Sequence, residues 1–194
     1  MSSSAFVDRV FANLPTARGK FTFNAWKQAG RVTKEGVGVL PTSGVDVDAM
    51  ASRILDVDHY RGNVDHVEEC RVVADPSNTD TKKHFYQRIK VPVLGSIHHE
   101  LTLEDLGERD GWRVIAWDQH PATDALSSKV GARSEYNVGA WLLKPDAVGY
   151  ALSSAPRKDD VGRLKFAALT KGADAGAAQV VEKNIEGMIR WSKR

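Results

Sequence analysis

Two adjacent histidines and a glutamate, His98, His99 and Glu100, are the first residues in the sequence that suggest chemistry. Neighbouring side chains of a β-strand point to opposite faces, so His98 and His99 cannot bind one metal ion together. His84, expected near His98 across a hairpin on the outer face, offers only an adventitious zinc contact. The H-E-x-x-H pattern of zinc enzymes is also missing from the sequence. We therefore expect no metal ion and no cofactor.

His99 is the best candidate for acid–base chemistry, because its ring is expected inside the fold and histidine titrates near neutral pH. If the protein is an enzyme, His99 and Tyr136 are the predicted catalytic pair, with Tyr150 as a possible alternative partner. A purely structural His99 is the interpretation we favour. The single cysteine, Cys70, cannot form an intramolecular disulfide and has no recognisable partner that would make it a nucleophile.

The elements that must position these side chains are mainly strands. Turn signals such as Pro92 to Gly95 and Glu108 to Gly111 separate the strand-like segments, and their shortness indicates an antiparallel meander. With one strand expected between residues 21 and 40, the sheet has seven strands. The other six are predicted at residues 66–73, 83–91, 97–106, 112–118, 132–143 and 148–153.

Helical periodicity marks the two ends of the chain and a short region after the first strand. Residues 4–14 form an amphipathic helix within an N-terminal extension, residues 1–20, which precedes one domain at residues 21–194. Two short helices are expected between residues 45 and 61. Residues 159–194 form a long C-terminal helix whose apolar stripe begins at Leu164. It must cover the sheet, since no other large element remains to do so.

Side-chain alternation along the strands gives the residues expected to face this last helix. They are mostly apolar but include Gln87, His99, Tyr136 and Tyr150, where a packed core prefers Leu, Ile and Val. An apolar wall with a few polar groups is typical of a ligand pocket. The alternative is a filled core in which these four side chains hydrogen-bond one another or the backbone. For the strand at residues 112–118, the alternation leaves open which of its two faces points toward the helix. The predicted ligand-binding residues are Phe85, Gln87, Ile89, His99, Leu101, Trp117, Tyr136, Val138, Tyr150, Val181 and Ile185.

Three segments resemble the START/SRPBCC superfamily, whose Bet v 1-like members share a helix-grip fold. Residues 45–60, followed by residues 66–76, resemble the opening of these domains. Residues 83–92 resemble a START strand that ends in Lys-Leu-Pro. The sequence Gly-Ala-Trp-Leu-Leu-Lys-Pro at residues 139–145 is similar to the family's Gly-Trp-Leu-Ile-Glu-Pro strand. The resemblance implies an α+β helix-grip fold, with a curved sheet around the long C-terminal helix. It also implies binding or transfer of a small hydrophobic ligand such as a lipid, sterol or polyketide-like aromatic.

Composition narrows the classes of function. The net charge of +2, from 27 basic and 25 acidic residues, leaves no electrostatic footprint for nucleic acid. The N-terminus does not resemble a signal peptide and no apolar run could span a bilayer, so we expect a cytoplasmic protein with at most transient peripheral membrane contact. Three hypotheses remain: a carrier or sensor of an apolar ligand, which we favour, a cyclase or hydrolase-like enzyme that uses His99, and an interaction module with a filled core.

Overall fold

One curved sheet organises the molecule, as the computed structural model shows for residues 3–91 and 95–194. The strand order is β1-β2-β8-β7-β6-β5-β4-β3, and each neighbouring pair is antiparallel. The strands are β1 (Thr22–Trp26), β2 (Glu35–Pro41), β3 (Val67–Val72), β4 (Lys82–Val91), β5 (Gly95–Arg109), β6 (Trp112–Gln119), β7 (Ala132–Lys144) and β8 (Ala147–Pro156). The helices are α1 (Ser3–Ala12), α2 (Val47–Leu55), α3 (Lys158–Val161) and α4 (Arg163–Ser192), with short 3₁₀ turns η1 (Val57–His59) and η2 (Pro121–Ala125).

The expected α+β architecture is present, but the sheet has eight strands rather than seven. The prediction of one strand between residues 21 and 40 is wrong, because this region folds into the β1–β2 hairpin. Its connection contains Gly30 with a positive φ, a conformation that glycine adopts without steric cost and that helps the chain reverse.

Local sequence signals account well for the remaining strands. At the β5–β6 hairpin, Asp110 and Gly111 both have a positive φ, as expected for an Asp-Gly turn of the primed type. α2 begins after Asp46, whose side chain accepts a hydrogen bond from the Ala49 N–H. The predicted turn from Pro92 to Gly95 falls largely on residues 92–94, which lie outside the described residues.

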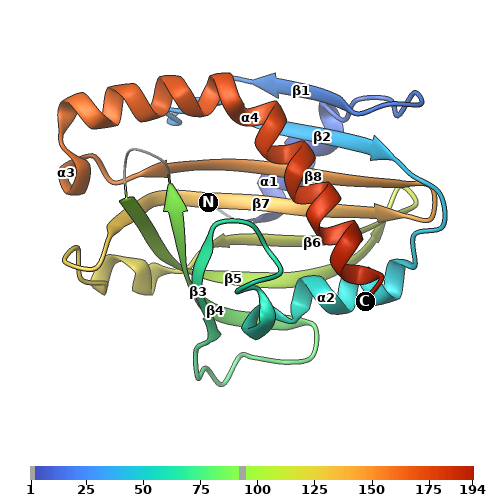
Figure 1. Ribbon diagram of the computed structural model, residues 1–194, viewed down its shortest axis with the longest axis horizontal. Helices are drawn as coiled ribbons and strands as arrows, with labels where there is room; N and C mark the ends of the chain where they lie inside the picture. The colour runs from blue at the N-terminus through green and yellow to red at the C-terminus, as the bar shows by residue number, and fades with distance from the viewer. Residues whose placement is uncertain (1–2, 92–94) are drawn as a thin grey trace.

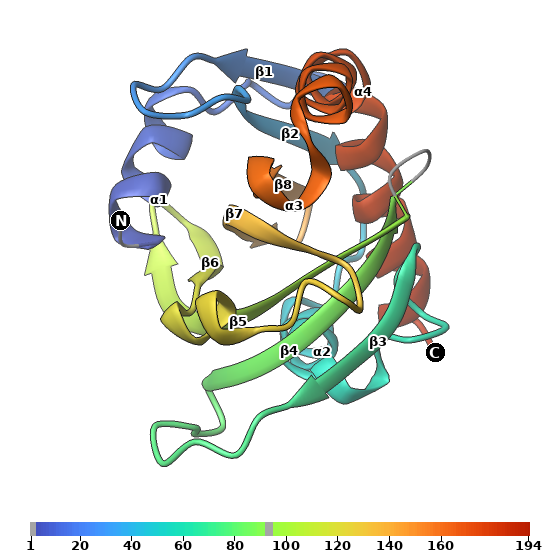
Figure 2. The same cartoon turned by 90° about the vertical axis from the view of Figure 1, so that its left-hand side faces the viewer.

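Helices cover both faces of the sheet (Figure 1). Seen along the strands in Figure 2, the sheet curves around α2 and the C-terminal part of α4, while α1 lies outside it on the convex face. Two apolar clusters result. The concave cluster includes Phe85, Leu101, Trp117 and Ile185. The convex cluster joins Phe6 and Val10 of α1 to side chains from the central strands.

This second cluster overturns part of the predicted inward face. Tyr136 and Val138 were expected beside Leu101 and Tyr150, but Val138 packs in the convex cluster and Tyr136 points the same way. The prediction is wrong because α1 buries the convex face of β7. Both faces of the strand are therefore apolar, and alternation cannot identify the face that points inward. On β6 the structure settles the open choice: Ile115 and Trp117 face inward.

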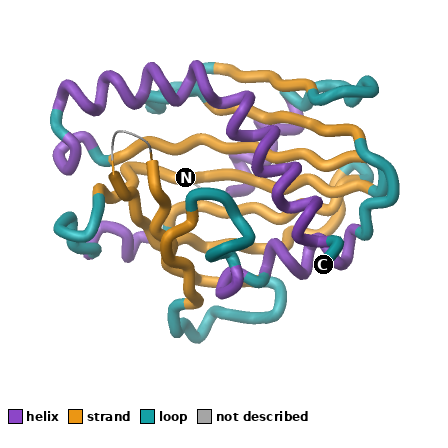
Figure 3. Tube along the Cα trace, viewed as in Figure 1, coloured by secondary structure: helices purple, strands orange, loops and turns teal. Residues whose placement is uncertain are grey.

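The C-terminal helix covers the sheet with only its second half. α4 runs for 30 residues and bends near its middle, the region that contains Gly172 and Gly176 (Figures 1 and 3). Among the α4 residues whose burial is described, the first buried one is Val181, whereas Leu164, the expected start of the apolar stripe, is 91% exposed. Across the described residues, none of the helices combines the length and apolar character needed to cross a membrane.

An ion pair holds α1 against the sheet. Arg9 of α1 donates two hydrogen bonds to the carboxylate of Glu35 on β2, from Nε at 2.7 Å and from a terminal nitrogen at 2.8 Å. The Glu35 side chain is fully buried, and the indole N–H of Trp26 donates to the same carboxylate. A buried carboxylate that loses its cation is strongly destabilising.

We therefore expect Arg9→Ala to lower the free energy of unfolding by about 3 kcal/mol. Chemical denaturation followed by circular dichroism would measure it. Arg18→Ala, which removes an exposed arginine just beyond α1, should leave the free energy of unfolding nearly unchanged, as is usual for surface substitutions. Equal stabilities of the two variants would show that the Arg9–Glu35 pair does not secure α1.

Candidate functional site: a hydrophobic cavity

A cavity of about 410 Å³ lies between the concave face of the sheet and α4. This volume falls within the usual range for small-molecule sites, roughly 300–1,000 Å³. Its deep wall is apolar, with side chains from β4, β5, β6, β7, β8 and the last turns of α4. These are Phe85, Leu101, Leu103, Trp117, Trp141, Tyr150, Leu152 and Met188, with Tyr60 from the end of η1.

The mouth of the cavity is identified by the lining residues that are exposed. They come from three places: the loop before β3, the end of β4 and the middle of α4. The exposed ones are Asp65, His66, Lys90, Gln179, Val180 and Lys183. Entry therefore lies between the β3–β4 edge of the sheet and the point where α4 begins to pack against it.

Aromatic rings form the floor. The ring of Tyr150 lies 4.4 Å from that of Trp141 and 5.5 Å from that of Trp117, centroid to centroid. Trp117 can lie flat on the sheet because its cross-strand neighbour is Gly139; a Cβ atom there would stand 2.0 Å from the indole. Such rings offer a large apolar surface to a ligand at little entropic cost.

A polar network closes one part of the cavity. Gln87 and Asn137 line it, and His99 lies behind them, fully buried. His99 Nδ1 is 2.8 Å from the Ser134 hydroxyl, and its Nε2 is 3.1 Å from the Gln87 side-chain oxygen. The indole N–H of Trp117 donates to the Asn137 side-chain oxygen at 2.9 Å.

These contacts define the state of His99. A neutral ring with its proton on Nε2 donates to Gln87 and accepts from the Ser134 hydroxyl, which satisfies both nitrogens. Burial and the neighbouring His98 lower the pKa of His99 to about 3. At neutral pH the ring therefore serves as an uncharged anchor for Gln87. Burial also raises the pKa of the Tyr150 and Cys70 side chains, so both stay protonated.

The residues predicted from the sequence separate into three groups. Those that line the cavity are Phe85, Gln87, Ile89, Leu101, Trp117 and Tyr150. Val181 and Ile185 pack in the concave core beneath α4 without lining it, and His99 stands one layer behind the wall. Tyr136 and Val138 instead border a polar hollow of about 390 Å³ on the convex side.

The predicted catalytic pair is not brought together. The Tyr136 hydroxyl, on the opposite face of the sheet from the cavity, accepts hydrogen bonds from the backbone N–H groups of Val32 and Thr33. His99 points into the concave side, where Gln87 and Asn137 separate it from the open space.

Sequence reasoning missed the residues that form the mouth. Alternation in strands can locate wall residues, but Val64, Asp65 and His66 lie in the loop before β3. Lys183 and Asn184 lie beside the buried stripe of α4. The inward residues of β7, Asn137 and Trp141, could have been found only by knowing that α1 covers the other face of that strand.

Comparison with known proteins supports the fold. Neither a scan of the sequence against protein-family models nor a search of curated proteins finds a match. The structure is similar to that of a STAR-related lipid transfer protein from Xanthomonas axonopodis, with a TM-score of 0.72 and 15% identity over 94% of this chain and 98% of that one. Human STARD10 matches with a TM-score of 0.72 and 15% identity, over 98% of this chain and 79% of that one.

A third similar structure is human StAR-related lipid transfer protein 5, with a TM-score of 0.64 and 10% identity over 98% of this chain and 94% of that one. At these identities the similarity concerns the fold. The chain has a START/SRPBCC-like fold, as the resemblance of its sequence segments led us to expect.

The buried neutral His99 predicts a pH dependence of stability. Its ordinary pKa is 6.5 and its folded value is about 3, so between these pH values the unfolded chain binds a proton that the folded protein excludes. The free energy of unfolding should therefore fall as pH decreases from 6.5 toward 3. His99→Gln should reduce this slope by about 1.4 kcal/mol per pH unit.

Denaturant unfolding at several pH values would measure both slopes. His59→Gln, which changes an exposed histidine outside the network, should keep the slope of the unmodified protein in this window. An unchanged slope in His99→Gln would mean that His99 takes up its proton at the same pH in the folded protein as in the unfolded chain.

Proposed function

We propose that this protein binds a small, mostly apolar ligand in the cavity between the sheet and α4. The observation that carries the proposal is the cavity itself, about 410 Å³ with an aromatic and aliphatic wall. A buried water occupies roughly 30 Å³, so the space far exceeds what a few packing defects would leave. This argues against the filled-core interaction module. The lipid-transfer proteins with similar structures support the same proposal.

Hydrophobic burial is of the same order as the free-energy cost of association. Each buried methylene contributes about 0.8 kcal/mol, so about ten such groups contribute roughly 8 kcal/mol. This is comparable to the estimated cost of association, roughly 4–15 kcal/mol. Affinity would then depend mainly on apolar area, and selectivity on the few polar groups in the wall.

Those polar groups favour a ligand with one polar end. His99 holds the oxygen of the Gln87 side chain, which leaves the amide nitrogen of Gln87 able to donate to a ligand in the cavity. Tyr150 likewise offers a protonated hydroxyl at the cavity wall. Both groups can donate to a carbonyl, hydroxyl or carboxylate oxygen. An amphipathic molecule such as a fatty acid or a sterol fits this description.

Filling the cavity should weaken ligand binding without unfolding the protein. Ile89 lines the cavity and is only partly buried, so Ile89→Trp can place an indole in the space. We expect fluorescent fatty-acid and sterol probes to bind the unmodified protein and to bind Ile89→Trp at least about tenfold more weakly, the equivalent of about 1.4 kcal/mol. Native mass spectrometry of the purified protein would reveal a co-purified ligand.

Leu106→Trp is the matched control, because it adds the same side chain at an exposed position outside the cavity lining. It should bind the probes like the unmodified protein. A protein that purifies without ligand and ignores every probe would contradict the proposal, as would equal binding by the two tryptophan variants.

Gln87→Leu tests the polar end separately. The substitution replaces the amide donor with an apolar side chain of similar size. It should weaken a fatty-acid probe about tenfold, since one hydrogen bond to a charged group contributes about 1.5–3 kcal/mol. Binding of a hydrocarbon probe without a head group should be unchanged or stronger. Equal weakening of both probes would indicate a distorted cavity rather than a lost polar contact.

A further inference from the structure

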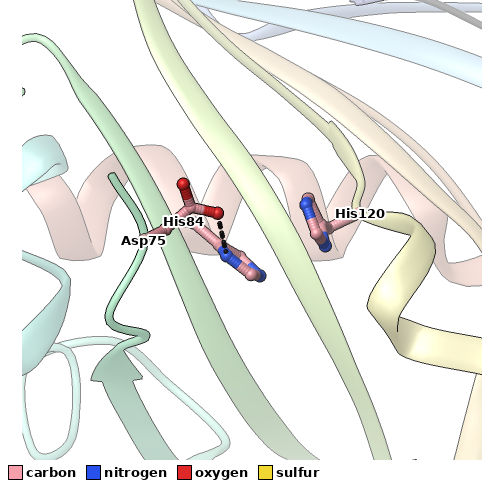
Figure 4. A group of neighbouring side chains, drawn as sticks. All are labelled: Asp75, His84 and His120. Carbon is pink, nitrogen blue, oxygen red and sulfur yellow. Dashed lines mark hydrogen bonds and ion pairs between the residues drawn. The ribbon is translucent and has the colours of Figure 1, made fainter. Parts of the chain in front are cut away.

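A second group of reactive side chains lies on the convex face of the sheet, away from the hydrophobic cavity. Asp75 lies in the loop after β3, His84 on β4 and His120 directly after β6 (Figure 4). One donor atom from each residue can be chosen so that all three lie within 4.8 Å of one another. Segments far apart in the sequence therefore bring two imidazoles and a carboxylate to one place.

The partners of His84 differ from those expected from the sequence. His84 was expected near His98, but the register of the β4–β5 hairpin places His84 opposite Thr102 and His98 opposite Arg88. This four-residue offset in the register separates the two histidines along the strands. The imidazole that does meet His84 is that of His120.

The central residue of this group, His84, is held from both sides. Its Nδ1 lies 2.9 Å from the Asp75 carboxylate, and its Nε2 lies 2.7 Å from the Glu100 carboxylate on β5. The His84 side chain is buried, 7% exposed, so these contacts leave the ring one orientation. The backbone N–H of Ser77 donates to the other oxygen of the Asp75 carboxylate at 2.8 Å, which fixes this group as well.

We propose that Asp75, His84 and His120 bind one divalent transition-metal ion, with Zn²⁺ as the best-suited species. Imidazole nitrogen and carboxylate oxygen are ligands that zinc prefers, at bond lengths of about 2.0–2.2 Å. A tetrahedral ion with these bonds places its ligand atoms roughly 3.3–3.6 Å apart. The His84 Nδ1–Asp75 pair, now 2.9 Å apart, must therefore widen slightly, while the His120 nitrogen must move to complete the set. His84 would bind through Nδ1, where the ion replaces a proton between the ring and Asp75.

Glu100 then takes the role that a carboxylate often has beside a metal-bound histidine. It accepts the Nε2–H of His84, which fixes the ring and raises the basicity of the ligating nitrogen. Glu100 is itself held in place: its backbone N–H donates to the Thr123 hydroxyl of η2, and its carbonyl accepts from the same hydroxyl. The strand that carries Glu100 and the segment after His120 are thus tied together.

His120 is the ligand that must move. Its ring stacks on His84 with centroids 3.8 Å apart and planes tilted by 30°, and its Nδ1 accepts a hydrogen bond from the Ala122 N–H. Binding requires the ring to turn and to exchange this hydrogen bond for the ion. His120 is partly exposed and borders the polar hollow on the convex side, which gives the ring room and the ion a path. A fourth coordination position would face that hollow.

The test uses the full chain after treatment with a chelator. Isothermal titration with Zn²⁺ should show one ion bound per chain, and Co²⁺ should give the intense visible absorption bands of a tetrahedral site. His120→Ala and Asp75→Asn should each abolish this binding. Glu100→Gln should weaken it by about 10–100-fold, as expected for an outer partner of a metal ligand.

His59→Ala is the matched control, because His59 is 71% exposed, contacts a carboxylate of its own and lies outside the group. It should bind Zn²⁺ like the unmodified protein. Binding of the hydrophobic probes should persist in His120→Ala, which separates this proposal from the cavity function and shows that the variant is folded. Failure of the unmodified protein to bind Zn²⁺, or undiminished binding by His120→Ala, would overturn the proposal and leave an Asp–His–Glu ion-pair network.

Discussion

The partial contact between α4 and the curved sheet is the feature on which both the core and the cavity depend. Val181, Ile185, Met188 and Trp191 lie on the second half of the helix and close the concave face. Each such side chain contributes about 1.5–3 kcal/mol when it is buried. The first half of the helix diverges from the sheet, as Figure 1 shows, and none of its described residues is buried. The cavity lies between the wall residues of β4 to β8 and the stretch of α4 that runs from Gln179 to Met188.

Such a cavity needs a scaffold that does not collapse onto it. The convex cluster beneath α1 supplies a second core on the other side of the sheet, which stabilises the central strands independently of what the concave face holds. The buried Arg9–Glu35 pair joins α1 to β2, and the Trp26 N–H satisfies the carboxylate further. Part of the stability therefore comes from contacts on the face of the sheet opposite the proposed ligand site.

The polar groups inside the sheet show how their neighbours decide their chemistry. His99 has a partner at each nitrogen, and burial keeps it neutral at physiological pH. It therefore orients Gln87 and is poorly suited to exchange protons near pH 7. His84, on the opposite face, lies between two carboxylates and beside a second imidazole. These groups together suit a bound metal cation. In our two proposals, residues of one type thus support the binding of an apolar ligand on one side of the sheet and bind a metal ion on the other.

Local patterns in the chain were sufficient for the α+β class, the hairpins after residue 66, the long last helix and six of the wall residues, but not for the β1–β2 hairpin. Period-two alternation and turn chemistry depend on near neighbours, and Asp110–Gly111 is a turn wherever it occurs in such a context. Local sequence does not show which face of β7 points into the concave side, because both faces are apolar. α1 packs on the convex face, and Tyr136 therefore lies on the side of the sheet away from His99.

Local sequence patterns also could not predict the mouth of the cavity or the group of side chains around His84. Each combines residues from segments that only the folded sheet brings together: the loop before β3 with the middle of α4, and Asp75 with His120. Short-range periodicity carries no information about such pairs, since their proximity follows from strand order and from the curvature of the sheet.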